Sequence, residues 1–213
     1  MHSLPPAQDL AYVASAVGVI VVAPQIQRIV RFPHLAGVSP WTWSITVVAC
    51  SLWLTYGLRS GSMPQVPGNV LLISGAVAIV LLVPARWSRR RRAAALGLMA
   101  VSLVAVSTRL SPEQVGFLAF AIGLTGMWPQ VAETVWQRRG LGPSSLSLSS
   151  SALKILSQTL WLSFALLTTD APVIAAALVT LTANGLVAAV EASRRRSATE
   201  PASHDTELVS AVA

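Results

Sequence analysis

The chain has 213 residues, of which 54% are hydrophobic and only 11% are charged, and its mean hydropathy is +0.64. A soluble domain carries about a quarter charged residues, so this composition excludes an ordinary water-soluble protein and indicates helices that cross a membrane. The net charge of +7 comes from arginines in short clusters between apolar runs. That spacing is typical of membrane topology, and we expect no nucleic-acid binding.

Seven apolar stretches are long enough to be membrane-spanning helices. The first carries Pro24 late in its course, Pro40 begins the second, and Pro84 ends the third. The fourth is short and rich in small residues, and Ser111 followed by Pro112 predicts a helix start before the fifth. We expect spans at about 10–30, 40–58, 63–83, 93–108, 112–136, 145–167 and 171–192.

The chain contains an internal repeat. The motif Pro24-Gln25 returns 105 residues later as Pro129-Gln130, and each copy lies late in an apolar run shortly before arginines. The other matched pairs, in the same order along the chain, are Trp53 with Trp161 and Asn69 with Asn184. An ordered series of matches indicates a duplicated structural unit, here one of three spans.

The repeat divides the chain into five expected regions. An outer tail (1–9) precedes the first three-span unit (10–84), and a basic loop with a linker span (85–110) leads to the second unit (111–193). The polar end of the chain (194–213) is expected to be a disordered cytoplasmic tail. Two units of three spans joined directly would have opposite directions in the membrane, because three is an odd number. The inserted fourth span gives both units the same direction. Parallel repeats of this kind place a substrate site near the midplane, at their interface.

The arginines predict the orientation. With the N-terminus outside, twelve basic residues lie on one face of the membrane and only Arg59 and Arg109 on the other. Positively charged loops stay in the cytoplasm, so we expect a multi-pass protein of the cell membrane with its C-terminus inside.

The paired Pro-Gln motifs, the Ser39-Pro40-Trp41 start of the second span and the matched tryptophans and asparagines resemble the SWEET (MtN3/saliva) sugar transporters of the PQ-loop clan. The resemblance covers about residues 8–195. It implies an all-α integral membrane protein with seven transmembrane helices, built as two parallel three-helix bundles joined by a linker helix (3+1+3). It also implies bidirectional facilitated diffusion of mono- or disaccharides by alternating access, without ion coupling.

The resemblance also implies roles for particular residues. The substrate-binding residues are expected to be Asn69 and Asn184, with Trp53 and Trp161 on either side of the sugar. The hinge set of the family maps to Pro24, Pro40 and Pro129, whereas its fourth position is occupied by Ser145. Pro143, two residues away, is a candidate substitute for that missing proline.

The chemistry of these side chains suits a neutral sugar. Asn amides both donate and accept hydrogen bonds, and Trp rings offer flat apolar faces to the C–H surface of a sugar. The alternative for each Asn is a hydrogen bond that joins two helices, worth roughly 0.6–2 kcal/mol in a membrane. The alternative for each Trp is an anchor at the membrane interface.

The two Pro-Gln motifs have a physical consequence of their own. Pro24 and Pro129 lack the N–H that would bond the carbonyl group four residues earlier, so each bends or loosens its helix. Gln25 and Gln130 can satisfy the backbone groups that are freed there. The motifs are therefore interpreted as hinges, and static kinks are the alternative.

Charged residues inside the spans separate the classes of transporter. No carboxylate is expected in the middle of a span, where proton-coupled carriers usually keep one, and this favours facilitated diffusion. Lys154 lies about nine residues into the sixth span. One interpretation is that Lys154 extends toward the cytoplasmic interface or contacts a neighbouring helix. The other is that it is a gate or a substrate contact.

The sequence has no metal-ligand spacing, phosphate-binding loop or second cysteine, so we expect no enzyme, no metal and no cofactor. The alternatives are a PQ-loop carrier of amino acids or other small solutes, and a non-transporting receptor or assembly protein, because fold alone does not fix function. The expected partners are a sugar, the lipid bilayer and, through the small-residue fourth span, another copy of the chain.

Overall fold

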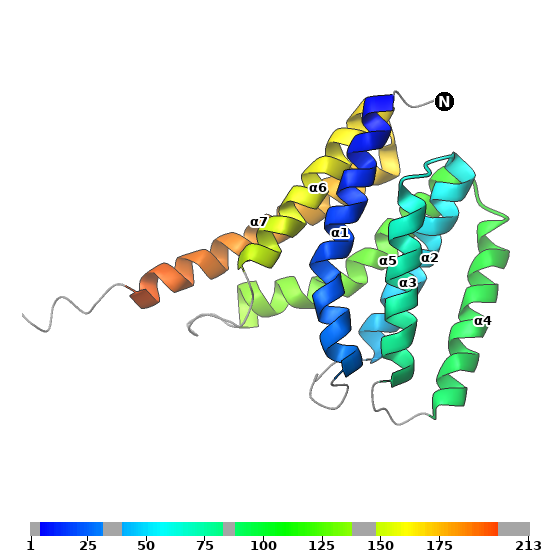
Figure 1. The fold of residues 1–213 in the computed structure, drawn as a ribbon, viewed down its shortest axis with the longest axis horizontal. Coiled ribbons are helices and arrows are strands. Elements are labelled where there is room, and N and C mark those ends of the chain that lie inside the picture. Colours follow the sequence, from blue (N-terminus) through cyan, green and yellow to red (C-terminus); the bar gives the residue numbers. More distant parts are fainter. Residues whose placement is uncertain (1–4, 32–39, 83–87, 138–147, 200–213) are drawn as a thin grey trace, which may run out of the picture.

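The computed structural model describes residues 5–31, 40–82, 88–137 and 148–199, and these residues form helices joined by short turns (Figure 1). The predicted all-α fold is confirmed there. The elements are α1 (Pro5–Arg31), α2 (Pro40–Ser60), α3 (Gln65–Leu82), α4 (Arg89–Ser107), α5 (Pro112–Ala132), the π-helical turn η1 (Glu133–Gln137), α6 (Leu148–Thr168) and α7 (Ala171–Thr199).

Two chain features fix the start of α5 and the position of α4. The Ser111 hydroxyl accepts a hydrogen bond from the Gln114 N–H at 3.2 Å, and the Gln114 side chain accepts one from the Ser111 N–H at 2.8 Å. This reciprocal pair is a capping box and confirms the predicted helix start. Arg59 at the end of α2 donates to the backbone carbonyls of Ser107 and Leu110, so the α4–α5 turn is tied to the first half.

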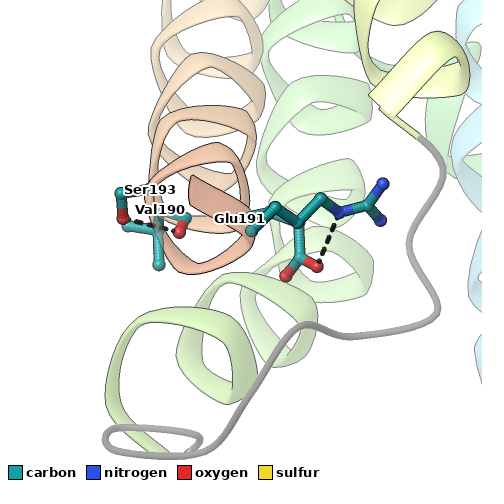
Figure 2. Close-up of polar contacts among 4 residues, drawn as sticks. Val190, Glu191 and Ser193 are labelled. Carbon is teal, nitrogen blue, oxygen red and sulfur yellow. Dashed lines mark hydrogen bonds and ion pairs between the residues drawn. The ribbon is translucent and has the colours of Figure 1, made fainter. Parts of the chain in front are cut away.

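Helix α7 continues to Thr199, so the prediction of a disordered tail from Arg194 is wrong for residues 194–199. Glu191, only 1% exposed, forms an ion pair with Arg195 one turn later at 3.4 Å, which is drawn in Figure 2. In addition, Nη2 of Arg194 donates a hydrogen bond to the carbonyl of Thr134 in η1 at 2.8 Å. These contacts hold the last turns of α7 in helical form and against η1.

The helices pack in the same order in both halves of the chain. Helix α3 contacts both α1 and α2, and α7 contacts both α5 and α6. The halves meet where α1 packs against α6 and where α2 packs against α5. Because the repeat relates α1 to α5 and α2 to α6, each of these interfaces is the counterpart of the other. Helix α4 packs against α2 and α3 at the edge of the molecule (Figure 1).

The outer surface of this helical assembly is apolar. On α4, for instance, Leu98 is 70% exposed and Val101 is 69% exposed. Such side chains on the outside suit a hydrocarbon environment better than water. Among the described residues, three helical stretches are long and apolar enough to cross a membrane, namely Gln65–Leu82, Ser151–Thr168 and Ala171–Ser197. The fold is therefore that of an all-α membrane protein.

Candidate functional site

A cavity of about 520 Å³ lies between the two halves and is lined by helices α1, α2 and α3 from one half and α5, α6 and α7 from the other. Its volume is within the range of small-molecule sites, about 300–1,000 Å³. All four predicted substrate-binding residues line it: Trp53, Asn69, Trp161 and Asn184. The structure thus brings together in one cavity side chains that are up to 131 residues apart in the sequence.

The two asparagines have the same local geometry. Nδ2 of Asn69 donates to the carbonyl of Gln65 at 2.7 Å, and Nδ2 of Asn184 donates to the carbonyl of Thr180 at 2.8 Å. Both bonds stay within one helix, so among the residues that the structure describes neither asparagine joins two helices in the way the alternative interpretation supposed. Each amide keeps its carbonyl oxygen and its second N–H for a ligand in the cavity.

The two tryptophans are also equivalent. Each is the fourteenth residue of its helix, so neither lies at a helix end where an interfacial anchor would be. Trp53 meets the Tyr56 ring edge-on, with centroids 5.7 Å apart, and Trp161 meets Phe164 in the same way at 5.8 Å. The neighbouring ring fixes the orientation of each indole at the cavity wall, because edge-on aromatic contacts are favourable.

One face of α6 supplies a polar row to the cavity: Lys154, Ser157 and Gln158, which lead to Trp161. The spacing of three, four and seven residues places them on one side of the helix. Lys154 is half-buried and lines the cavity, whereas no Asp or Glu is among the described lining residues. Ser157 and Gln158 were not predicted from the sequence. They lie four and three residues before Trp161, a spacing that places them on the same face of the helix as the tryptophan.

The matched row on α2, 108 residues earlier, also lines the cavity but is less polar. Its members, in the same order, are Thr46, Ala49, Cys50 and Trp53. Both rows therefore end in a tryptophan, and the residues before it differ in polarity and charge.

Next to the tryptophans of the cavity lies a contact between the halves that the sequence did not reveal. The Tyr56 hydroxyl, on α2, donates a hydrogen bond to Oδ1 of Asp170 in the α6–α7 turn at 2.6 Å. The N–H of Val173 donates to the same oxygen at 3.2 Å. Burial raises the pKa of Asp170 above its ordinary value, although the bonds from Tyr56 and Val173 act in the opposite direction.

Apolar packing surrounds this hydrogen bond. A cluster of buried residues from both halves, centred on Tyr56, lies against the two tryptophans of the cavity; its members are Leu52, Tyr56, Val115, Ala119, Ala165 and Val173. At its edge, a Cβ on Gly116 would lie 2.7 Å from Cβ of Pro172 in the same half and 3.0 Å from the Tyr56 ring of the other half. Tyr56 is therefore tightly packed against the second half beside the tryptophans.

The predicted hinge residues are only partly described. Helix α1 is continuous across Pro24 and Gln25, and Pro40 is the first residue of α2. Helix α5 contains Pro129 and Gln130, and the wider π-helical turn η1 begins four residues after the proline. Ser145 and Pro143 lie outside the described residues. Their role as hinges stays a prediction.

Comparison with known proteins concerns the fold. The structure is similar to that of a eukaryotic SWEET transporter solved at 3.7 Å resolution, with a TM-score of 0.73 and 15% sequence identity, and the match covers 89% of this chain and 99% of that chain. No family model and no curated protein matches the sequence. The chain therefore has a SWEET-like fold, as its matched motifs predicted.

Proposed function

We propose that this chain is a membrane transporter that carries mono- or disaccharides by facilitated diffusion in both directions. The observation that carries this proposal is the pairing of Asn69 with Asn184 and of Trp53 with Trp161 around one cavity between the two halves. The amides offer donors and acceptors to sugar hydroxyls, and the indoles offer apolar faces to the ring. The SWEET-like fold supports the same class of substrate.

The position of the cavity favours alternating access. It lies between two halves with the same packing order, so a rocking motion of one half against the other would expose it to either side. In this mechanism the contact between Tyr56 and Asp170 is a closed gate, and it has to break for that side to open. The proline motifs at Pro24 and Pro129 are the proposed hinges.

The proposed topology is two parallel three-helix bundles joined by α4, with the N-terminus outside the cell membrane and the C-terminus in the cytoplasm. The clustered arginines support it, because positively charged loops remain cytoplasmic. The Tyr56–Asp170 gate then faces the outside. The lining residues that the structure describes include no carboxylate to bind a coupling proton, which favours uniport.

Uptake of labelled glucose and sucrose into liposomes that contain the purified protein tests the proposal. We expect uptake that does not respond to an imposed pH gradient. Asn69→Ala and Asn184→Ala should each lower kcat/KM roughly tenfold or more, because each leaves bound hydroxyl groups without a partner.

The chain offers a matched control for each variant. Ser74 on α3 and Thr182 on α7 are exposed, and each donates to the carbonyl four residues earlier, as the asparagines do. Ser74→Ala and Thr182→Ala should leave uptake unchanged. Absence of sugar uptake by folded protein would contradict the proposal, and uptake of amino acids instead would favour a carrier of that class.

A further inference from the structure

We infer that the cavity prefers sugars that carry a single carboxylate to neutral sugars, and that Lys154 binds this carboxylate. The inference rests on the proposed function and adds to it a preference among the transported sugars.

The first argument is the position of Lys154. It lies on the face of α6 that lines the cavity, one turn before Gln158 and two turns, or roughly 10 Å, before Trp161. Its side chain is a compact charge on a flexible four-carbon stem, which suits contact with the end of a ligand whose ring lies near the tryptophans. A half-buried lysine on this face contributes to the cavity itself.

The second argument is charge balance. Among the described residues that line the cavity, Lys154 is the one with a formal charge, and it forms no ion pair with any of the described carboxylates. Charged groups at membrane depth are costly and are paired or serve function. A bound carboxylate would balance one lysine, whereas a phosphate, with nearly two negative charges, would leave an excess in the cavity.

The third argument is the asymmetry between the halves. The position on α2 that matches Lys154 is Thr46, and the position that matches Gln158 is Cys50. The cation therefore comes from the second half and has no charged counterpart in the first half. A neutral, evenly hydroxylated sugar needs no such one-sided charge, whereas a sugar acid has one charged end to orient.

The test uses the full chain in liposomes with labelled glucuronate and labelled glucose, each in competition with the other. We expect the wild-type protein to favour glucuronate, and Lys154→Met to lower the ratio of glucuronate to glucose uptake at least tenfold. Lys154→Arg should restore most of the ratio, because it restores the charge. Arg109→Met removes one exposed positive charge outside the cavity and should leave the ratio as in the wild type.

Each other outcome overturns the inference in a distinguishable way. Two results would mean that Lys154 does not contact the ligand: glucose uptake that glucuronate does not inhibit, or an unchanged ratio of glucuronate to glucose uptake in Lys154→Met. The proposed sugar transport would stand in both cases. Inhibition by glucose 6-phosphate that exceeds that by glucuronate would replace the carboxylate with a phosphate. Failure to carry any of these sugars would remove the proposed function as well.

Discussion

The two halves of the molecule present the same residue types in the cavity and different ones beside it. An asparagine and a tryptophan come from each half, with the same helix positions and the same neighbouring contacts. Beside the cavity, Tyr56 of the first half bonds to Asp170, whereas its counterpart Phe164 packs against Ala7 and Ala11 with apolar atoms alone. The shared residues line one cavity between the halves, and the exchanged residues make one of the two interfaces a polar contact.

The largest effect in this comparison should come from Gly116, where the first half has the buried Ala11 at the matched position. A Cβ at Gly116 would lie 2.7 Å from Cβ of Pro172 and 3.0 Å from the Tyr56 ring, and neither neighbour has a flexible end that can yield. We expect Gly116→Ala to lower the free energy of unfolding by about 2 kcal/mol. Thermal unfolding of the purified protein in detergent measures it.

The matched control for this prediction is two turns further along the same helix. A Cβ at Gly123 would meet no atom within 4 Å. Gly123→Ala should be neutral or stabilising by up to ~1 kcal/mol, because alanine favours the helix. Equal unfolding temperatures for the two alanine variants would show that the packing at Gly116 is looser than the structure indicates.

The next largest effect should come from making the first half resemble the second. Tyr56→Phe removes the hydroxyl that donates to Asp170 and leaves that half-buried carboxylate with one donor fewer. We expect a loss of about 1.5 kcal/mol in the free energy of unfolding, the size of a hydrogen bond to a charged group. Tyr12→Phe is the control, since Tyr12 is 45% exposed. A loss no larger than in the control would mean that the bond adds nothing to the closed interface.

The sequence predicted the features that the repeat copies. A membrane requires each span to satisfy its own backbone, so the helices followed from the apolar runs, and duplication placed Asn69 and Asn184 at corresponding points. The capping residue Ser111 was visible because capping is a local pattern. These predictions need only the spacing of residues along the chain and the match between corresponding positions of the two repeats.

The features that the sequence did not predict depend on how the helices are rotated against one another. Tyr56 and Asp170 are 114 residues apart, and nothing in either neighbourhood points to the other. In a soluble protein an apolar stripe marks the inner face of a helix, but in lipid both faces are apolar, so only the helical spacing of Lys154, Ser157 and Gln158 indicates the inner face of α6. The extension of α7 was different, because Glu191 and Arg195 have the spacing of a helical ion pair that the sequence analysis did not weigh.

A smaller effect should follow from exchanging the residues that end the second helix of each half. Gly61 after α2 has φ 76°, and its counterpart Thr169 after α6 has φ 53°, a left-handed conformation that costs a β-branched residue about 1–2 kcal/mol. Thr169→Gly should stabilise the protein by ~0.5 kcal/mol, since glycine loses part of this gain to chain entropy. Gly61→Thr should destabilise it by about 1 kcal/mol. Shifts of the same sign in both variants, measured by thermal unfolding, would contradict the shared backbone conformation.

The smallest effect concerns the pH dependence of the contact between Tyr56 and Asp170. Because burial raises the pKa of Asp170 above its ordinary value of 3.8, the folded protein holds this proton more tightly than the unfolded chain does. The resulting stabilisation is complete below pH 3.8 and is lost as the pH rises through the raised pKa. As the pH rises from 3.8 through the raised pKa, the unfolding temperature of the wild type should therefore fall relative to that of Asp170→Asn. The asparagine keeps an oxygen that accepts from Tyr56, but it does not titrate.

The variant Tyr56→Phe extends this pH test to the comparison between the halves. The tyrosine hydroxyl lowers the pKa of Asp170, so its removal should raise that pKa further and move the loss of stability to higher pH. An identical pH profile in Tyr56→Phe and the wild type would mean that the carboxylate does not sense the tyrosine. The contact between Tyr56 and Asp170 would then stabilise its interface no more than the apolar packing around Phe164 stabilises the other one.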